Sequence, residues 1–253
     1  MAAPLRLGTL EIDCADPLST ATLYATLTGW FQLEMPQGLI LTTDNLIMIV
    51  FKQSEILHRP PVWPEEPGEE QKQMHLDFTV DELAPAVEQA LQAGAKIAAM
   101  QYGGENFLTM IDPEGQPFCL CKRSESSFER YFRERGYTAI PNPSLNIDCT
   151  DVASLRSFYA ELTSWDQGFH ETALVTEQGM VVHFMLCDFE YRPPVWPEHE
   201  GAQQKHMLLT LHTNDLQQAV EKAVHLGATR PSLLGDTPGI CLLDPQGHPF
   251  RIV

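Results

Sequence analysis

The segment LEIDCADPLSTATLYATLTGW at residues 10–30 recurs, with many substitutions, as LNIDCTDVASLRSFYAELTSW at residues 145–165. The seven residues RPPVWPE also occur twice, at an offset of 133 residues. A third pair, DPEGQPF from Asp112 and DPQGHPF from Asp244, has an offset of 132 residues. Because the offsets drift by only a few residues, the chain is predicted to hold two homologous domains of about 120 residues each.

The repeat divides the 253 residues into three parts. We expect a first domain over residues 1–123 and a second over residues 140–253. Residues 124–139 between them are charged and carry three aromatic residues at helical spacing, which predicts a short linker helix. The domains are expected to pair within the chain about a pseudo-twofold axis, and a further homodimer is left open.

Within each repeat the apolar period changes in a regular order. Apolar and polar residues alternate over residues 9–14, as in a strand. Asp16 and Pro17 then start a helix, and Gly29 ends it. Three short apolar runs follow as strands, and the order restarts at Met74. Each domain therefore reads as βαβββ twice.

Acidic residues outnumber basic ones by 34 to 16, which gives a net charge of −18. This balance argues against nucleic acid or an anionic membrane as partner, because both are bound mainly by clustered lysine and arginine. The sequence has no secretory signal and no apolar run of about eighteen residues. Its six cysteines are few and scattered, so we expect a cytoplasmic protein with free thiols.

These motifs, in this order, resemble the glyoxalase, bleomycin-resistance and extradiol-dioxygenase superfamily, the vicinal oxygen chelate (VOC) proteins. The resemblance is to the glyoxalase-like subgroup in two tandem copies. It is carried by the Cys-x-Asp-Pro helix start, the PPVWP loops, the MHLDF strand and the DPEGQPF turn. It implies an α+β fold in which paired βαβββ modules curl each domain's mixed sheet into a cup around a small-molecule site, with helices outside.

The resemblance also implies where a metal would be bound, since metal-dependent members take ligands from the first, fifth and eighth strands. Those positions fall on Thr9, His75 and Cys119 in the first domain and on Ser144, Leu208 and Arg251 in the second. Only His75 is a typical ligand, and the fixed positive charge of Arg251 repels a cation. We therefore expect no metal or other cofactor, with a divalent ion at His75 as the alternative.

Strand alternation gives the residues that face each cup. The first cup is expected to hold Thr9, Glu11, His75, Asp77, Cys119 and Cys121, and the second Ser144, Asn146, His183, Leu208, Thr210 and Arg251. His75 and Asp77 could bind Zn²⁺, form an acid–base pair, or hydrogen-bond each other in a polar cup. Arg251 could bind a ligand carboxylate or pair with Asp244, and His183 could face inward or be structural.

Trp63 and Trp196 lie in the two PPVWP loops, where prolines stiffen the chain. Each indole could stack as a lid over a flat or cationic ligand. Each could equally pack as a plug between the modules of a domain.

The function expected from these observations is metal-independent binding of a small organic molecule, cationic or neutral aromatic, in the manner of the sequestering resistance proteins of the superfamily. The alternative is a lyase, isomerase or dioxygenase with a non-standard metal or acid–base site centred on His75. A third possibility is a protein-interaction module whose cups are filled by bulky apolar side chains.

Overall fold

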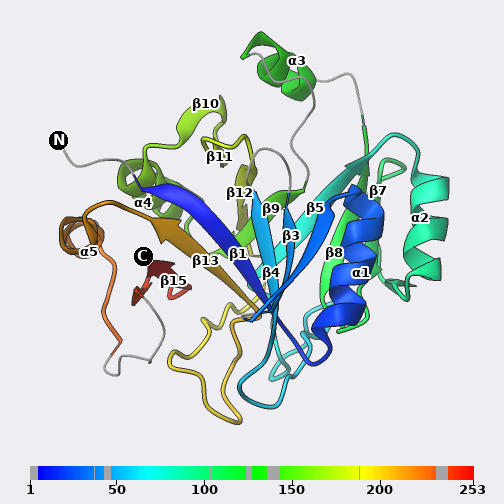
Figure 1. Ribbon diagram of the computed structural model, residues 1–253, viewed down its shortest axis with the longest axis horizontal. Helices are drawn as coiled ribbons and strands as arrows, with labels where there is room; N and C mark the ends of the chain where they lie inside the picture. Colours follow the sequence, from blue (N-terminus) through cyan, green and yellow to red (C-terminus); the bar gives the residue numbers. More distant parts are fainter. Residues whose placement is uncertain are drawn as a thin grey trace.

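The computed structural model describes residues 5–36, 38–42, 47–102, 104–123, 127–135, 143–187, 189–231 and 239–253. Over these residues the chain forms two mixed β-sheets with helices packed against both of them (Figure 1). The α+β class expected from the sequence is confirmed. No helix in the described part of the chain is long and apolar enough to cross a membrane.

The order of elements follows the sequence repeat. The first half forms β1 (Arg6–Cys14), α1 (Pro17–Thr28), β2 (Phe31–Met35), β3 (Gly38–Thr42), β4 (Met48–Gln53), β5 (Met74–Val80), α2 (Leu83–Gln92), β6 (Lys96–Ile97), β7 (Phe107–Ile111) and β8 (Pro117–Lys122). Helix α3 (Ser127–Glu134) follows, within the segment expected to be a linker helix. The second half forms β9 (Ser144–Cys149), α4 (Val152–Thr163), β10 (Asp166–His170), β11 (Ala173–Val175), β12 (Val181–Leu186), β13 (Met207–His212), α5 (Leu216–His225), β14 (Ile240–Leu243) and β15 (Pro249–Ile252).

The helix boundaries have local causes. The Asp16 carboxylate caps α1 by accepting from the backbone N–H of Leu18 at 3.1 Å, and Asp151 caps α4 in the same way. Gly29 ends α1 in the left-handed conformation, with φ of 69°. Ser164 adopts the same conformation at the end of α4, where the residue is not glycine.

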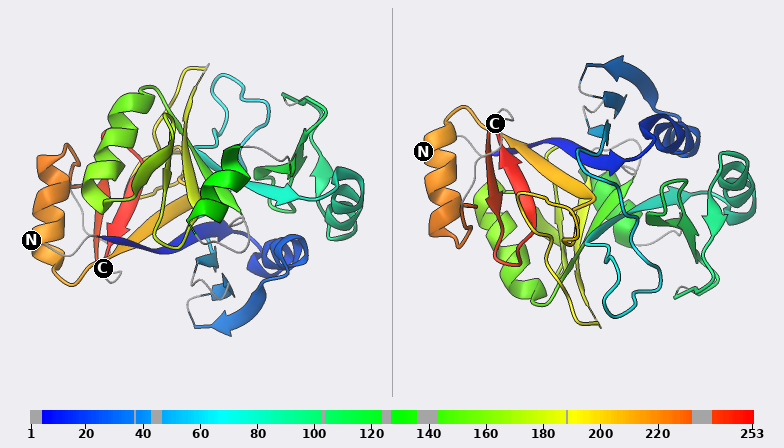
Figure 2. Two further views of the ribbon diagram at one scale, coloured as in Figure 1. Left: turned by 90° about the horizontal axis from the view of Figure 1, so that it is seen from above. Right: turned by 90° about the horizontal axis from the view of Figure 1, so that it is seen from below.

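Each sheet takes one βαβββ unit from each half of the chain. Sheet A has the strand order β14-β15-β13-β1-β4-β3-β2, and sheet B has the order β10-β11-β12-β9-β5-β8-β7-β6. The halves meet along antiparallel pairs, with Leu10 of β1 opposite Leu209 of β13 and His75 of β5 opposite Asn146 of β9. Figure 2 shows β1, in blue, beside β13, in orange.

The expectation that each repeat closes its own sheet is therefore wrong. The first unit pairs with the fourth, and the second pairs with the third. The physical reason is the long connection over residues 54–73, and its counterpart before β13, which carry the chain from one sheet to the other. Sequence repeats reveal units but not which units pair.

Helices of each half pack between the two sheets, within one continuous hydrophobic core to which both halves contribute. The Tyr24 ring of α1 lies 5.5 Å from Phe51 in sheet A and 5.2 Å from Phe78 in sheet B. The strand residues expected on the helix side, Leu10, Ile12, Leu76, Phe78, Phe118 and Leu120, are all buried. The helices therefore pack one unit of sheet A against one unit of sheet B within the same half.

The two DPxG turns differ in how their buried aspartates are neutralised. At the first turn, Tyr24 donates to the Asp112 carboxyl at 3.0 Å, and the backbone N–H of Gln116 also donates to it. No cation contacts that carboxyl in the described structure. At the equivalent turn, His248 Nδ1 lies 2.9 Å from the Asp244 carboxylate. Burial raises the pKa of Asp112 to about 7, whereas the Asp244 carboxylate outweighs burial and raises the pKa of His248.

We expect opposite effects from removing these two charges. An aspartate titrates near pH ~3.9 in an unfolded chain, so the raised pKa of Asp112 means that stability is lost as the pH rises from about 4 to about 7. Asp112→Asn should gain at least about 1 kcal/mol over the unmodified protein at pH 8, and less at pH 5. Asp244→Asn should lose about 2 kcal/mol or more because His248 loses its partner. Urea unfolding at both pH values measures this, and effects of the same sign would contradict it.

Candidate functional site

Strands β5 and β8 bring three reactive side chains together on the inner face of sheet B. One ligand atom from each of His75, Asp77 and Cys119 lies within 4.8 Å of the others. Asp77 is opposite Cys119 in the register of β5 and β8, and His75 Nε2 lies 3.4 Å from Asp77 Oδ1. All three side chains are half-buried, so the expected His75–Asp77 contact exists at a site that solvent reaches.

The second half of the chain completes this site, which we call the His75 cluster. Across the junction of the halves, Asn146 lies opposite His75, and Ser144 lies opposite Asp77. On the next strand, His183 is beside Asn146. The cluster therefore consists of His75, Asp77, Cys119, Ser144, Asn146 and His183, which the sequence had divided between two cups.

The surroundings shift the pKa values of three members of the cluster. Burial alone would raise the pKa of Asp77, but the adjacent His75 imidazole, the Asn146 amide and nearby His183 hold it below its usual range. Burial lowers the pKa of His183, so that imidazole is neutral at pH 7. Burial, reinforced by the Asp77 charge, raises the pKa of the Cys119 thiol to about 12. The cluster thus presents a carboxylate beside a protonated thiol and a neutral imidazole.

Two polar atoms of the cluster lack partners. Among the described residues, His75 Nδ1 and Asn146 Nδ2 are buried without a partner at hydrogen-bonding geometry, whereas Asp77 Oδ1 has the His75 imidazole 3.4 Å away. Leaving a buried polar group unsatisfied costs about 1–3 kcal/mol. These atoms therefore mark the part of the cup where water or the polar group of a ligand would be stabilised.

Helix α3 closes one side of the same face. Its Tyr131 and Phe132 pack with Phe169 against the apolar residues of β11 and β12, namely Ala173, Val175 and Val181. On the opposite side, Phe107 is opposite Cys121 in the β7–β8 register and is 51% exposed. The cup of sheet B is therefore filled beyond His183, whereas His75, Asp77 and Cys119 remain half-buried.

The inner face of sheet A carries a different set of residues. Arg251 Nη1 lies 2.5 Å from the Glu11 carboxylate, and Thr210 donates to the same carboxylate at 3.2 Å. Thr9 lies opposite Thr210 on this face. Of the two alternatives left open for Arg251, the pairing with Asp244 is wrong, because β1 and β15 belong to one sheet and Arg251 pairs with Glu11 instead.

The grouping of candidate residues by repeat is also wrong, for the same topological reason. Thr9, Glu11, Leu208, Thr210 and Arg251 lie on sheet A, and the His75 cluster lies on sheet B. The Glu11–Arg251 ion pair neutralises these two side chains within the protein.

Both tryptophans of the PPVWP loops cover buried lysines. The Lys72 ammonium lies 5.0 Å from the centre of the Trp63 ring, and Lys205 lies 5.1 Å from that of Trp196. Both indoles are half-buried. The cation that each indole faces thus belongs to the protein itself.

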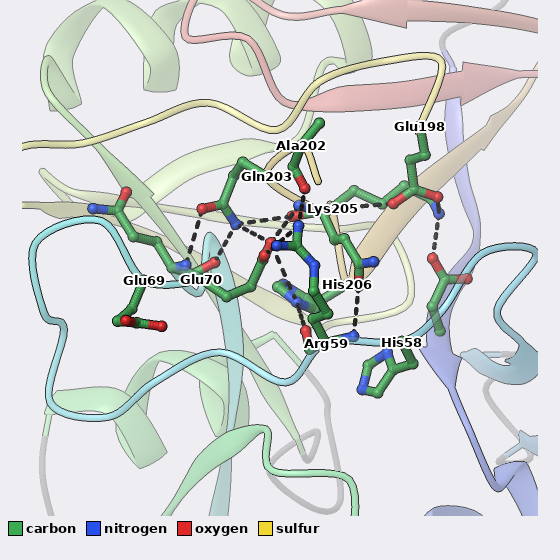
Figure 3. Close-up of polar contacts among 12 residues, drawn as sticks. His58, Arg59, Glu69, Glu70, Glu198, Ala202, Gln203, Lys205 and His206 are labelled. Atoms are coloured by element: carbon green, nitrogen blue, oxygen red, sulfur yellow. Dashed lines mark hydrogen bonds and ion pairs between the residues drawn. The ribbon is translucent and has the colours of Figure 1, made fainter. Parts of the chain in front are cut away.

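Residues that flank each PPVWP loop join the two halves through hydrogen bonds and ion pairs, as Figure 3 shows. Arg59 Nη2 lies 2.7 Å from Glu70, and Gln203 donates to Glu70 at 2.7 Å. His206 Nε2 lies 2.9 Å from the Arg59 carbonyl, and burial lowers the pKa of His206 to about 4. Sequence reasoning missed this network, although the recurrence of EEQKQ at 69–73 as AQQKH at 202–206 was a readable signal.

Comparison with known proteins now identifies the family. A family model described as Glyoxalase-like domain matches residues 9–121 and 144–253. The chain belongs to this family. The two matched segments show that the glyoxalase-like domain occurs twice in tandem. The VOC resemblance drawn from the sequence is confirmed.

Solved structures agree with the fold of this glyoxalase-like protein. A variant of glyoxalase I from Zea mays is 13% identical, with a TM-score of 0.64, and the match covers 99% of this chain and 94% of that chain. A putative dioxygenase from Bacillus subtilis is 11% identical, with a TM-score of 0.57 and coverage of 100% and 86%. At such low identity the likeness shows the fold alone. No curated protein matches the sequence.

Proposed function

We propose that the protein binds a small organic molecule at the His75 cluster without a metal, in the manner of sequestering members of the superfamily. The observation that carries this proposal is the group of half-buried polar side chains that converge on the inner face of sheet B, where His75 Nδ1 and Asn146 Nδ2 are buried without a partner among the described residues. A few convergent polar groups of this kind are typical of small-molecule sites.

The chemistry of the cup favours a cationic or neutral aromatic molecule with a hydrogen-bond donor. The Asp77 carboxylate is ionised because its pKa is low, so it attracts a donor or a positive charge. The protein's net charge of −18 disfavours an anion.

A thermal-shift screen of organic cations, neutral aromatics and organic anions tests this proposal. We expect hits among the first two classes, with affinity reduced about tenfold or more in Asp77→Asn, since the lost charge-assisted hydrogen bond is worth about 1.5–3 kcal/mol. Thr9→Ala, on the inner face of sheet A, is the matched control and should bind normally. Hits confined to anions, or equal binding by Asp77→Asn, would refute the proposal.

A metal centre at the same place is the second candidate, because the donors present fit a divalent ion. The imidazole of His75, the carboxylate of Asp77 and the thiol of Cys119 are the ligand types of Zn²⁺, and they converge within 4.8 Å. A bound ion would act as a Lewis acid toward a substrate oxygen. We rank it second because the neighbouring β9 positions supply only Ser144 and Asn146, which are weak donors.

Elemental analysis of tag-free protein distinguishes the two candidates. Metal-independent binding predicts far less than one equivalent of any transition metal. One equivalent of a transition metal that is retained in Thr9→Ala and lost in His75→Ala would establish the metal centre. An enzymatic role would then become the first candidate function.

A further inference from the structure

A cleft of about 550 Å³ lies outside the His75 cluster, where α3, the end of α4 and the turn after β11 meet the start of β1. Figure 1 shows α3 above β10 and β11, with α4 and the start of β1 beside them. Its apolar lining includes Leu5, Tyr131, Trp165 and Val175. None of the residues of the His75 cluster lines it. Its volume is within the range of small-molecule sites.

Two opposite charges on its walls are left without partners. Arg6 and Glu177 both line the cleft, and neither side chain forms an ion pair or hydrogen bond with any residue that the structure describes. They are held on neighbouring segments because Gln178 donates to the Leu7 carbonyl at 2.7 Å. The wall of the cleft thus carries one exposed cation and one exposed anion, neither of them paired within the described structure.

The other charged groups of the cleft are already engaged. Arg135 Nε lies 3.3 Å from Asp166 Oδ2, and the Arg135 guanidinium stacks on the Tyr131 ring at 3.6 Å. The residues that end α4, Thr163 and Ser164, also line the cleft. A helix C-terminus carries partial negative charge, which favours an ammonium over a second carboxylate nearby.

We propose that this cleft binds a free amino acid with a large apolar side chain, as a zwitterion. The ligand carboxylate pairs with Arg6, its ammonium with Glu177, and its side chain packs on Leu5, Trp165 and Val175. A zwitterion satisfies both unused charges at once, which a singly charged molecule does not. This proposal is independent of the function proposed for the His75 cluster.

The indole N–H of Trp165 gives a readout, because Trp165 lines the cleft and its buried Nε1 has no hydrogen-bond partner in the described structure. Its NMR cross-peak in ¹⁵N-labelled protein is assigned with Trp165→Phe. We titrate L-phenylalanine, L-leucine and L-methionine, and compare 3-phenylpropanoate and 2-phenylethylamine, which each carry one charge. The expected result is a saturable shift with at least one amino acid, and binding about tenfold or more weaker for both singly charged probes.

Variants separate this site from a non-specific effect. Arg6→Gln and Glu177→Gln change exposed side chains, so both should fold, and each should weaken amino-acid binding about tenfold. Arg230→Gln, an exposed arginine outside the cleft, and His75→Ala should bind normally. No saturable shift with any of the three amino acids would overturn the proposal. Equal binding of a singly charged probe, or unchanged binding by Arg6→Gln and Glu177→Gln, would also overturn it.

Discussion

Fragments of residues 1–123 and 140–253 are expected to fold as the native structure only when both are present. Each sheet is completed by strands from the two halves, so separation opens the antiparallel pair β1–β13 in one sheet and β5–β9 in the other. The exposed strand edges carry residues buried in the intact protein, such as Leu10 and Leu76. Open apolar strand edges tend to self-pair or aggregate.

The measurement is size-exclusion chromatography with ¹H–¹⁵N spectra of each fragment alone and of the equimolar mixture. We expect each fragment alone to aggregate, self-associate or unfold, and the mixture to give a one-to-one complex with the spectrum of the intact chain. An intact chain cleaved at an engineered protease site in residues 124–126 is the control, since it should remain assembled. A monomeric fragment with a dispersed spectrum would contradict the shared-sheet architecture.

Local patterns predicted the elements well, because their causes are local. Asp16 and Pro17 placed the start of α1, and the alternation around Leu76 and Phe78 placed the buried face of β5. Pairing of units depends instead on where long connections carry the chain, and no local pattern in the loop sequences reveals that direction. Sequence patterns could therefore not predict that the two halves share each sheet.

The same difference between local and long-range features applies to the candidate site. The sequence placed His75, Asp77 and Cys119 on one face, which the structure confirms, since alternation along β5 and β8 fixes it. The sequence did not join them to Ser144 or His183, because these lie more than sixty residues away from His75 in the chain and meet it only across the junction of the halves. Nor did it join Glu11 to Arg251.

The buried lysines should be among the most sensitive positions in the protein. Lys205 is 4% exposed, and its ammonium contacts the carboxylates of Asp13 and of Glu198, the latter at 2.8 Å. The neighbouring acids outweigh burial and raise the pKa of Lys205. Because Asp13 belongs to the first half and Lys205 to the second, this contact ties the halves together.

The same arrangement recurs at the second buried lysine, Lys72. Lys72 contacts Asp148 from the second half, and lies 3.2 Å from Glu65. Burial opposes its charge and these acids sustain it, so its pKa is also raised. Each lysine neutralises two carboxylates that are themselves largely buried.

Lys205→Met and Lys72→Met are each expected to cost about 3–5 kcal/mol of unfolding free energy. Methionine fills much of the lysine volume, so the loss arises from the two carboxylates left buried without a counter-charge and not from a cavity. Urea unfolding at pH 7 measures the effect. Lys96→Met, at an exposed position, is the matched control and should change stability by no more than about 0.5 kcal/mol.

A second substitution tests the cause of the loss. If uncompensated charge is responsible, adding Asp13→Asn to Lys205→Met should restore part of the stability, because one of the two stranded charges is removed. The same Asp13→Asn change in the unmodified protein should be destabilising, since Lys205 then loses a partner. If the effects of the two substitutions are additive, Lys205 stabilises the contact between the halves through packing against Trp196, and not through its charge.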